Sequence, residues 1–211
     1  MAFIVFEGLD ASGKSTLIQK VEKYLSENGQ SSLLLRDPGS TDLGESLRNI
    51  ILDTKITPPV PRAETLMYQA ARVQMVEKRI LPELAKGNWV LCDRFHSSTV
   101  AFQSFARGLE LQAVEQLNHF VAHDCVPDLY IFLDIPVEES QKRKQSRSEE
   151  SGVEQDRMEK EAIDFQQKVR EGYMYLSQKT PENWLVLDGT QTPEELLNKT
   201  VDEIRKRQWL N

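Results

Sequence analysis

The chain alternates short apolar runs with longer stretches in which apolar residues recur every three or four positions. The short runs predict buried strands, and the longer stretches predict helices. Strands are expected at 3–6, 32–35, 88–92, 129–134 and 184–187. Helices are expected from about 17 to 28, then at 43–52, 62–86 with a bend near Pro82, 97–105, 110–123, 137–147, 157–178 and 193–209.

This alternation predicts an α/β fold with one five-stranded parallel sheet and helices on both of its faces. No repeat, low-complexity stretch or linker divides the chain, so we expect a single domain over 1–211. The polar stretch 146–156 is expected to be a loop. Ligands bind beyond the carboxyl ends of such strands. The polar residues after the first three strands should therefore converge there.

Charge and cysteine content narrow the functional class. The chain carries 26 basic and 33 acidic residues, a net charge of −7, which argues against a general nucleic-acid or membrane-surface binder. Cys92 and Cys125 lie far apart without metal-like spacing, so a reduced, cytoplasmic location is expected. We see no pattern typical of a signal peptide or transmembrane span.

The most specific local pattern is Gly8-x-x-x-x-Gly13-Lys14-Ser15, which follows an apolar run and precedes a helical stretch. Glycines let the backbone approach an anion closely, and the next helix presents its positive end. Lys14 would reach the β- and γ-phosphates of ATP, and the Ser15 hydroxyl would bind Mg²⁺. The predicted ATP-binding residues are Gly8, Leu9, Asp10, Ala11, Ser12, Gly13, Lys14, Ser15 and Thr16.

Asp93 and Arg94 directly follow the third apolar run. A carboxylate at that position typically holds Mg²⁺, here through a water, and the guanidinium fork of arginine suits phosphate. Two simpler interpretations stay open at this point. Asp93 could cap a helix, and Arg94 could form a structural ion pair.

Several motifs together resemble the bacterial thymidylate kinases, a family of P-loop nucleoside monophosphate kinases. The matching segments, in family order, are 6–16, 36–39, 66–72, 92–103, 107–108 and 156–157. The resemblance implies transfer of the γ-phosphoryl group of ATP to dTMP, giving dTDP and ADP for dTTP biosynthesis. It also implies a homodimer that packs a long helix against its twin.

The resemblance further implies how the acceptor is held. Tyr68, where most members have Phe, would stack on thymine; Arg72 and Gln103 would read its edge. Phe102 would crowd a ribose 2′-hydroxyl. The implied dTMP-binding residues are Asp10, Asp37, Arg48, Tyr68, Arg72, Arg94, Ser98, Thr99, Phe102 and Gln103. Tyr68 could instead pack between helices, Arg48 and Arg72 could be solvated charges, and Ser98 and Thr99 could simply bond to helix backbone.

Ala11 suggests where the remaining catalytic charge comes from. Some family members carry a basic residue at this loop position, whereas others bring the charge from a mobile lid. With Ala11 the chain resembles the second group, and the lid would be the segment at about 143–157. We rank Arg147 first and Arg143 next, with Arg157 as the anchor. The implied catalytic residues are Lys14, Asp93, Arg94, Arg143 and Arg147, although a run of charge is often only a solvated face.

Two other functions remain open from the sequence alone. One is a kinase for a different nucleoside or nucleotide, although Arg72 and Gln103 favour thymine over a purine and Arg48 favours a monophosphate acceptor. The other is a binding module switched by a nucleotide, with no turnover. A second, base-shaped pocket argues against the module.

Overall fold

The computed structural model describes residues 1–122, 125–152 and 154–210. It contains a five-stranded sheet in the order β2-β3-β1-β4-β5, and every pair of neighbours is parallel. The strands are β1 (Phe3–Gly8), β2 (Ser32–Arg36), β3 (Trp89–Asp93), β4 (Leu129–Asp134) and β5 (Trp184–Asp188). The predicted α/β architecture is therefore confirmed.

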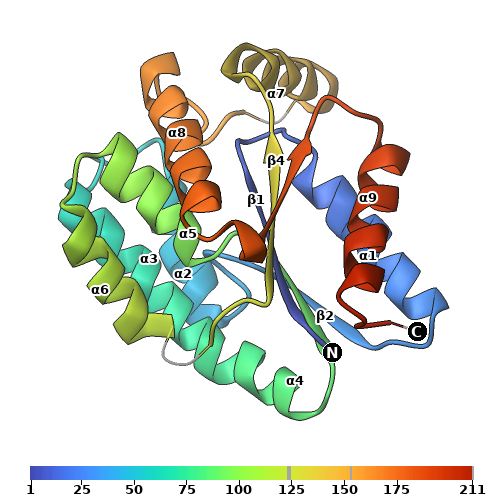
Figure 1. Cartoon of the computed structure of the whole chain (residues 1–211). Coiled ribbons are helices and arrows are strands. Elements are labelled where there is room, and N and C mark those ends of the chain that lie inside the picture. The colour runs from blue at the N-terminus through green and yellow to red at the C-terminus, as the bar shows by residue number, and fades with distance from the viewer. Residues whose placement is uncertain (123–124, 153, 211) are drawn as a thin grey trace.

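Alternate residues of the central strand face opposite layers of helices. Ile4 and Phe6 face α1 (Lys14–Glu27) and α9 (Pro193–Lys206), where Leu17 and Ile204 complete one core. Phe3 and Val5 face the opposite layer. Figure 1 shows α1 and α9 on one side of the sheet and α3, α6 and α8 on the other. Because β1 is buried on both faces, its first four residues, Phe3 to Phe6, are all apolar rather than alternating.

The second layer holds most of the remaining helices. They are α2 (Asp42–Leu52), α3 (Pro61–Met75), η1 (Val76–Ile80), α4 (Leu81–Ala85), α5 (His96–Thr99), η2 (Val100–Ala106), α6 (Leu111–Ala122), α8 (Ile163–Lys179) and the short η3 (Pro181–Asn183). The predicted end of one helix at His123 lies outside the described residues.

Two predicted helices contain a wider, π-helical stretch. The helix expected over 62–86 consists of α3, η1 and α4, and η1 comes just before Pro82. Proline lacks a backbone N–H and crowds the preceding turn, which accounts for the irregularity near the expected bend. The helix expected over 97–105 consists of α5 and η2, and η2 carries Phe102 and Gln103.

The segment 146–156 was wrongly expected to be a loop throughout. Helix α7 (Val137–Ser151) runs through its first half and ends where Gly152 adopts a left-handed conformation, with φ 68°. A helix whose residues are almost all polar has no apolar period, so the sequence pattern could not reveal this extension. Hydrogen bonds between polar side chains on its surface, such as Gln145 to Glu149, support it.

Helix α8, predicted over 157–178, also begins later than expected, at Ile163 rather than near Arg157. The Asp156 carboxylate accepts hydrogen bonds from the backbone N–H groups of Met158 and Glu159, which folds a turn in place of a helix. The Arg157 backbone N–H donates to the Leu52 carbonyl at 3.2 Å. These contacts tie the segment that follows α7 to the end of α2.

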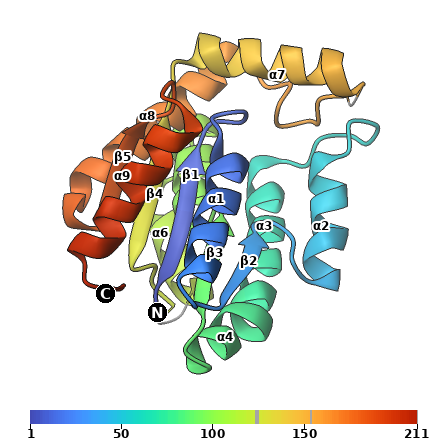
Figure 2. The same cartoon turned by 90° about the vertical axis from the view of Figure 1, so that its right-hand side faces the viewer.

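Helix α7 lies across the carboxyl ends of the central strands, as Figure 2 shows. The Ser140 hydroxyl donates to the Asp10 carbonyl at 2.8 Å and so fixes the start of α7 to the loop after β1. Across the ranges that the structure describes, no helix is both long and apolar enough to cross a membrane.

Candidate active site

The loop between β1 and α1 has the backbone that its glycine spacing predicts. Gly8 and Gly13 have φ of 141° and 102°, values that disfavour other residues. A Cβ on Gly8 would lie 2.6 Å from the Leu133 carbonyl oxygen, so a side chain does not fit there. The Lys14 ammonium donates to the Gly8 and Leu9 carbonyls at 3.1 and 2.9 Å. The loop thus curves around its own lysine at the start of α1.

Ser15 and Asp93 line one shared pocket, as expected of a magnesium site. The buried Oδ1 of Asp93 has no hydrogen-bond partner among the described residues. Asp93 is also not a helix cap, because the N-cap of α5 is Phe95. An unpartnered carboxylate oxygen near a hydroxyl is the donor set that Mg²⁺ prefers, so these residues fit the ion.

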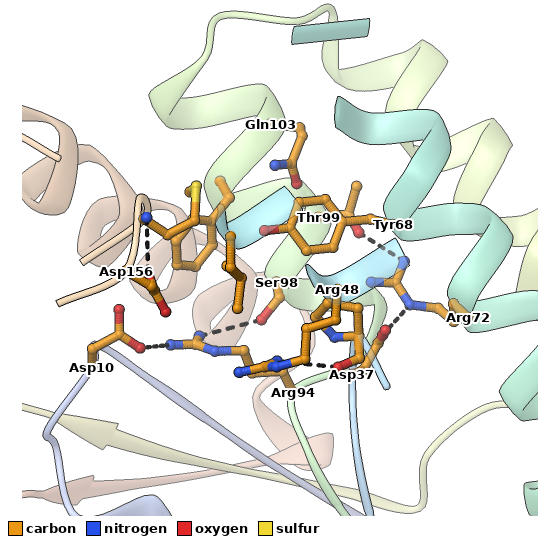
Figure 3. Close-up of a pocket in the computed structure, with 14 residues that line it drawn as sticks. Asp10, Asp37, Arg48, Tyr68, Arg72, Arg94, Ser98, Thr99, Gln103 and Asp156 are labelled. Carbon is orange, nitrogen blue, oxygen red and sulfur yellow. Dashed lines mark hydrogen bonds and ion pairs between the residues drawn. The ribbon is translucent and has the colours of Figure 1, made fainter. Parts of the chain in front are cut away.

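A second pocket gathers every residue predicted to bind the acceptor. Its lining consists of Asp10, Asp37, Pro38, Arg48, Leu52, Tyr68, Arg72, Arg94, Ser98, Thr99, Phe102, Gln103, Asp156 and Met158. Figure 3 shows Asp10, Arg48 and Arg94 toward one end and Tyr68, Arg72 and Gln103 toward the other. We name these ends after the groups that the sequence predicts there, the phosphate end and the base end.

Arg94 dominates the phosphate end and is held from several directions. Its Nη2 donates to Asp10 Oδ1 at 2.7 Å, its Nη1 donates to the Tyr173 hydroxyl at 2.8 Å, and its guanidinium carbon lies 5.1 Å from the Phe102 ring centre. Burial alone would raise the pKa of Asp10, but the charges of Arg94 and Lys14 lower it below the ordinary value. Arg94 also has a φ of 68°, a strained conformation that is typical of functional positions.

A buried network lies behind Arg94. The Glu7 carboxylate is fully buried and accepts from the Ser98 hydroxyl at 2.7 Å. Ser98 in turn lies 2.8 Å from the Tyr173 hydroxyl. Arg94 can only donate, so the Tyr173 hydroxyl accepts from it and can donate to Ser98, whose hydroxyl donates to Glu7. Burial raises the pKa of the Glu7 carboxyl above its ordinary value, although the Arg94 charge and the serine hydroxyls oppose that shift. Arg94 does form an ion pair with Asp10, and it also lines the pocket.

Arg72 anchors the base end. It forms a buried ion pair with Asp37, and its Nη1 donates to the Thr99 hydroxyl at 2.7 Å and to Gln69 Oε1 at 2.9 Å. Asp37 Oδ1 is buried and has no hydrogen-bond partner within the described ranges. Arg48 donates to the Pro38 carbonyl at 3.1 Å, beside the pocket. Arg72 and Arg48 are therefore not solvated helix charges.

The lid candidates lie in different places. Arg143 lines a pocket next to the loop, with Ala11, and donates to the Gly189 carbonyl at 3.0 Å. Arg147 forms an ion pair with Glu159 and is 52% exposed, and it lines neither pocket. Lys144, which lies in the same segment and was not ranked from the sequence, is fully buried, and its charge contributes to lowering the pKa of Asp10. Of the basic residues on α7, Lys144 is therefore the one whose charge acts on the Asp10 carboxylate.

Sequence reasoning missed several residues of this site. Asp156 was noted only as part of a motif, although its side chain lines the pocket with Met158 and Leu52. Glu7 lies inside the recognised loop motif, which was the available signal for it. Nothing near Tyr173 in the sequence indicates a contact with Arg94.

Comparison with known proteins agrees with this geometry. A family model described as thymidylate kinase matches residues 6–200. The chain is 43% identical over 210 residues to the thymidylate kinase of Bdellovibrio bacteriovorus, covering 100% of this chain and 98% of that one. It is 40% identical to that of Thermoanaerobacter sp. and 38% identical to that of Trichlorobacter lovleyi, each time covering 97% of both chains.

Proposed function

The chain belongs to the thymidylate kinase family, and we propose that the loop after β1 holds the donor of its reaction and that the pocket lined by Asp10 and Arg94 holds the acceptor. The reaction transfers the γ-phosphoryl group of ATP to dTMP, giving dTDP and ADP. The loop Gly8–Thr16 binds the phosphates of ATP, and the pocket between Arg94 and Gln103 binds dTMP. Asp10 belongs to both sites and lies where they meet.

At the acceptor site, Arg48 and Arg94 bind the monophosphate, and Asp10 lies near the sugar. Tyr68 stacks on thymine, Arg72 and Gln103 contact its edge, and Phe102 limits the space beside the ribose. Asp37, Ser98 and Thr99 complete the wall. The single observation that carries this proposal is that one pocket is lined by all of the side chains predicted from the sequence to bind dTMP.

The mechanism we propose depends on alignment and charge neutralisation. The attacking oxygen belongs to a phosphate that is already ionised at neutral pH, so no strong general base is needed. Lys14 and Arg94 offset negative charge on the transferring group, and Arg143, Lys144 and Arg147 bring further positive charge from the lid. Closure of the lid at 143–157 excludes water and so suppresses hydrolysis of ATP.

Mg²⁺ completes the proposed donor site, with Ser15 and Asp93 as the residues that hold it, Asp93 through a water. When bound, the ion supplies further charge neutralisation at the phosphates. The unpartnered Oδ1 of Asp93 supports this assignment.

We also propose that the chain works as one domain over 1–211, in the cytoplasm, as a homodimer. An exposed apolar surface supports the dimer. Leu66 of α3 is 58% exposed and lines a shallow pocket with Leu109, Val114 and Leu117 of the neighbouring α6 region. An apolar face of this kind on a long helix suits packing against a second copy.

Turnover with a panel of acceptors tests the proposal. In a coupled assay of ADP formation, dTMP should give far higher kcat/KM than dGMP, dAMP or thymidine. Tyr68→Ala should raise the KM for dTMP by about tenfold or more through loss of stacking, with little change in the KM for ATP. A raised KM for ATP with an unchanged KM for dTMP would refute the assignment of Tyr68.

A further inference from the structure

Glu64, in the first turn of α3, is a buried acid that connects three parts of the molecule. It is 1% exposed. Its carboxylate accepts from Gln103 Nε2 at 3.2 Å, from Arg107 Nε at 3.1 Å and from Arg157 Nη2 at 2.5 Å. Gln103 and Arg107 belong to η2 and its end, and Arg157 belongs to the segment that follows α7. Glu64 therefore touches both the base end of the pocket and the return of the proposed lid.

The carboxylate of Glu64 is ionised. Burial alone would raise its pKa, but the hydrogen bonds and charges of Arg107 and Arg157 lower the pKa below its ordinary value. An ionised carboxylate has no proton to donate, so it can only accept hydrogen bonds. The contact with Gln103 must therefore be a donation from the Gln103 amide nitrogen.

This fixes which way the Gln103 side chain points. With Nε2 held by Glu64, the carbonyl Oε1 must lie on the other side of the amide. Figure 3 shows that oxygen directed toward the Tyr68 ring, inside the pocket. No described residue donates a hydrogen bond to it. Gln103 therefore offers the pocket an acceptor rather than a donor.

We propose that Glu64 is a positioning residue that makes Gln103 select a base carrying an N3–H. Thymine has that hydrogen, whereas the N3 of a cytosine ring is itself an acceptor and would face Oε1 with no hydrogen between them. This inference rests on the proposed role of the pocket as the dTMP site. A buried acid that never touches the substrate would thus determine part of its specificity.

The closest test compares dTMP with 5-methyl-dCMP, which keeps the methyl group and changes the hydrogen-bonding edge of the base. Glu64→Gln is isosteric and lets the Gln103 amide turn over. We expect the ratio of kcat/KM for dTMP to that for 5-methyl-dCMP to fall by about tenfold, the effect of one hydrogen bond at the base. Arg72 keeps its own contacts, so some preference for dTMP should remain.

Arg157→Gln is the matched control. It removes one of the two charged contacts of Glu64 and leaves the contacts with Arg107 and Gln103 in place. Turnover of both nucleotides should fall together, with an unchanged ratio. If Arg157→Gln lowers the ratio as much as Glu64→Gln does, Glu64 acts through the lid and the proposal is wrong.

Glu64→Asp covers the case in which Glu64→Gln does not fold. It keeps the negative charge that holds both arginines but withdraws the carboxylate from Gln103, so the ratio should still fall. A folded Glu64→Gln or Glu64→Asp enzyme with the wild-type ratio would overturn the proposal. Failure of the wild-type enzyme to prefer dTMP over 5-methyl-dCMP would instead refute the proposed function of the pocket.

Discussion

The ion pairs of the proposed acceptor pocket are buried, whereas those of Arg143 and Arg147 on the proposed lid helix are exposed. In the pocket, the Arg72–Asp37 pair is almost completely buried, with side-chain exposures of 2% and 1%. On α7, the Arg143–Glu139 pair is 32% exposed on each side, and Arg147 is 52% exposed. Buried pairs break at high cost because the remaining charge is left unpaired, whereas exposed pairs contribute little.

This difference suggests a division of labour between the two regions. The pocket is built during folding, so its side chains are already oriented when a nucleotide arrives. Under the mechanism proposed above, the exposed ion pairs of α7 would exchange for contacts with phosphates during a catalytic cycle. Breaking a buried pair in the pocket should therefore lower the free energy of unfolding strongly. Breaking an exposed pair on the lid helix should hardly change it.

The largest effect is expected for Arg94→Ala. Removing this guanidinium takes away charge that offsets the transferring phosphoryl group, so kcat should fall by about 10³-fold or more. The variant should still fold, because the strands and both cores are unchanged. Steady-state kinetics measures kcat, and a circular-dichroism spectrum checks that the variant is folded. Near-normal turnover would disprove the role assigned to Arg94.

Asp37→Asn should chiefly affect stability. It leaves the buried charge of Arg72 without its counter-ion, which costs about 3–5 kcal/mol of the free energy of unfolding. Urea denaturation at neutral pH measures this loss. A change of less than about 1 kcal/mol, the range of exposed pairs, would mean that the base end is not pre-built.

A pH dependence should come from His96, which lies behind the base end and contacts the Tyr130 hydroxyl at 2.8 Å. Burial, with a contribution from Arg72, lowers the pKa of His96 to about 3. The unfolded chain, with a histidine pKa near 6.5, then binds a proton that the folded chain does not. The contribution of His96 to the free energy of unfolding should therefore fall by at most about 1.4 kcal/mol from pH 7.5 to 5.5.

His96→Gln isolates that contribution, because glutamine does not titrate and can still bond to Tyr130. Urea midpoints of the variant should change less between the two pH values than those of the wild type. An identical pH dependence in both proteins would contradict this, because it would mean that folding does not lower the pKa of His96.

The smallest effect on stability is expected for Glu139→Gln, which breaks the exposed pair with Arg143. The free energy of unfolding should change by less than about 1 kcal/mol. This variant is the lid counterpart of Asp37→Asn in the same urea experiment. A loss as large as that of the pocket variant would remove the contrast between the two regions.

The sequence predicted those features that local patterns encode. Apolar runs located the strands, and the spacing of Gly8, Gly13 and Lys14 located the loop. The acceptor residues came from motifs whose members lie close together in sequence. The polar half of α7 was missed, because a helix without an apolar face leaves no periodic signal.

The supporting residues could not be predicted, because their roles come from distant partners. Glu64 bonds to Gln103 across 39 positions, and Arg94 bonds to Tyr173 across 79. A glutamate on a helix is ordinarily a surface residue, and its sequence neighbours do not reveal burial between two arginines. Only the packing of α3, η2 and α8 brings these groups together.

A crystal structure with dTMP alone, without ATP, tests the central claim most directly. We predict thymine against Tyr68 with its edge at Arg72 and Gln103, the monophosphate at Arg48 and Arg94, and pocket side chains in the positions described above. Density for the base at the Arg94 end would contradict the account, and so would a pocket rebuilt around the nucleotide.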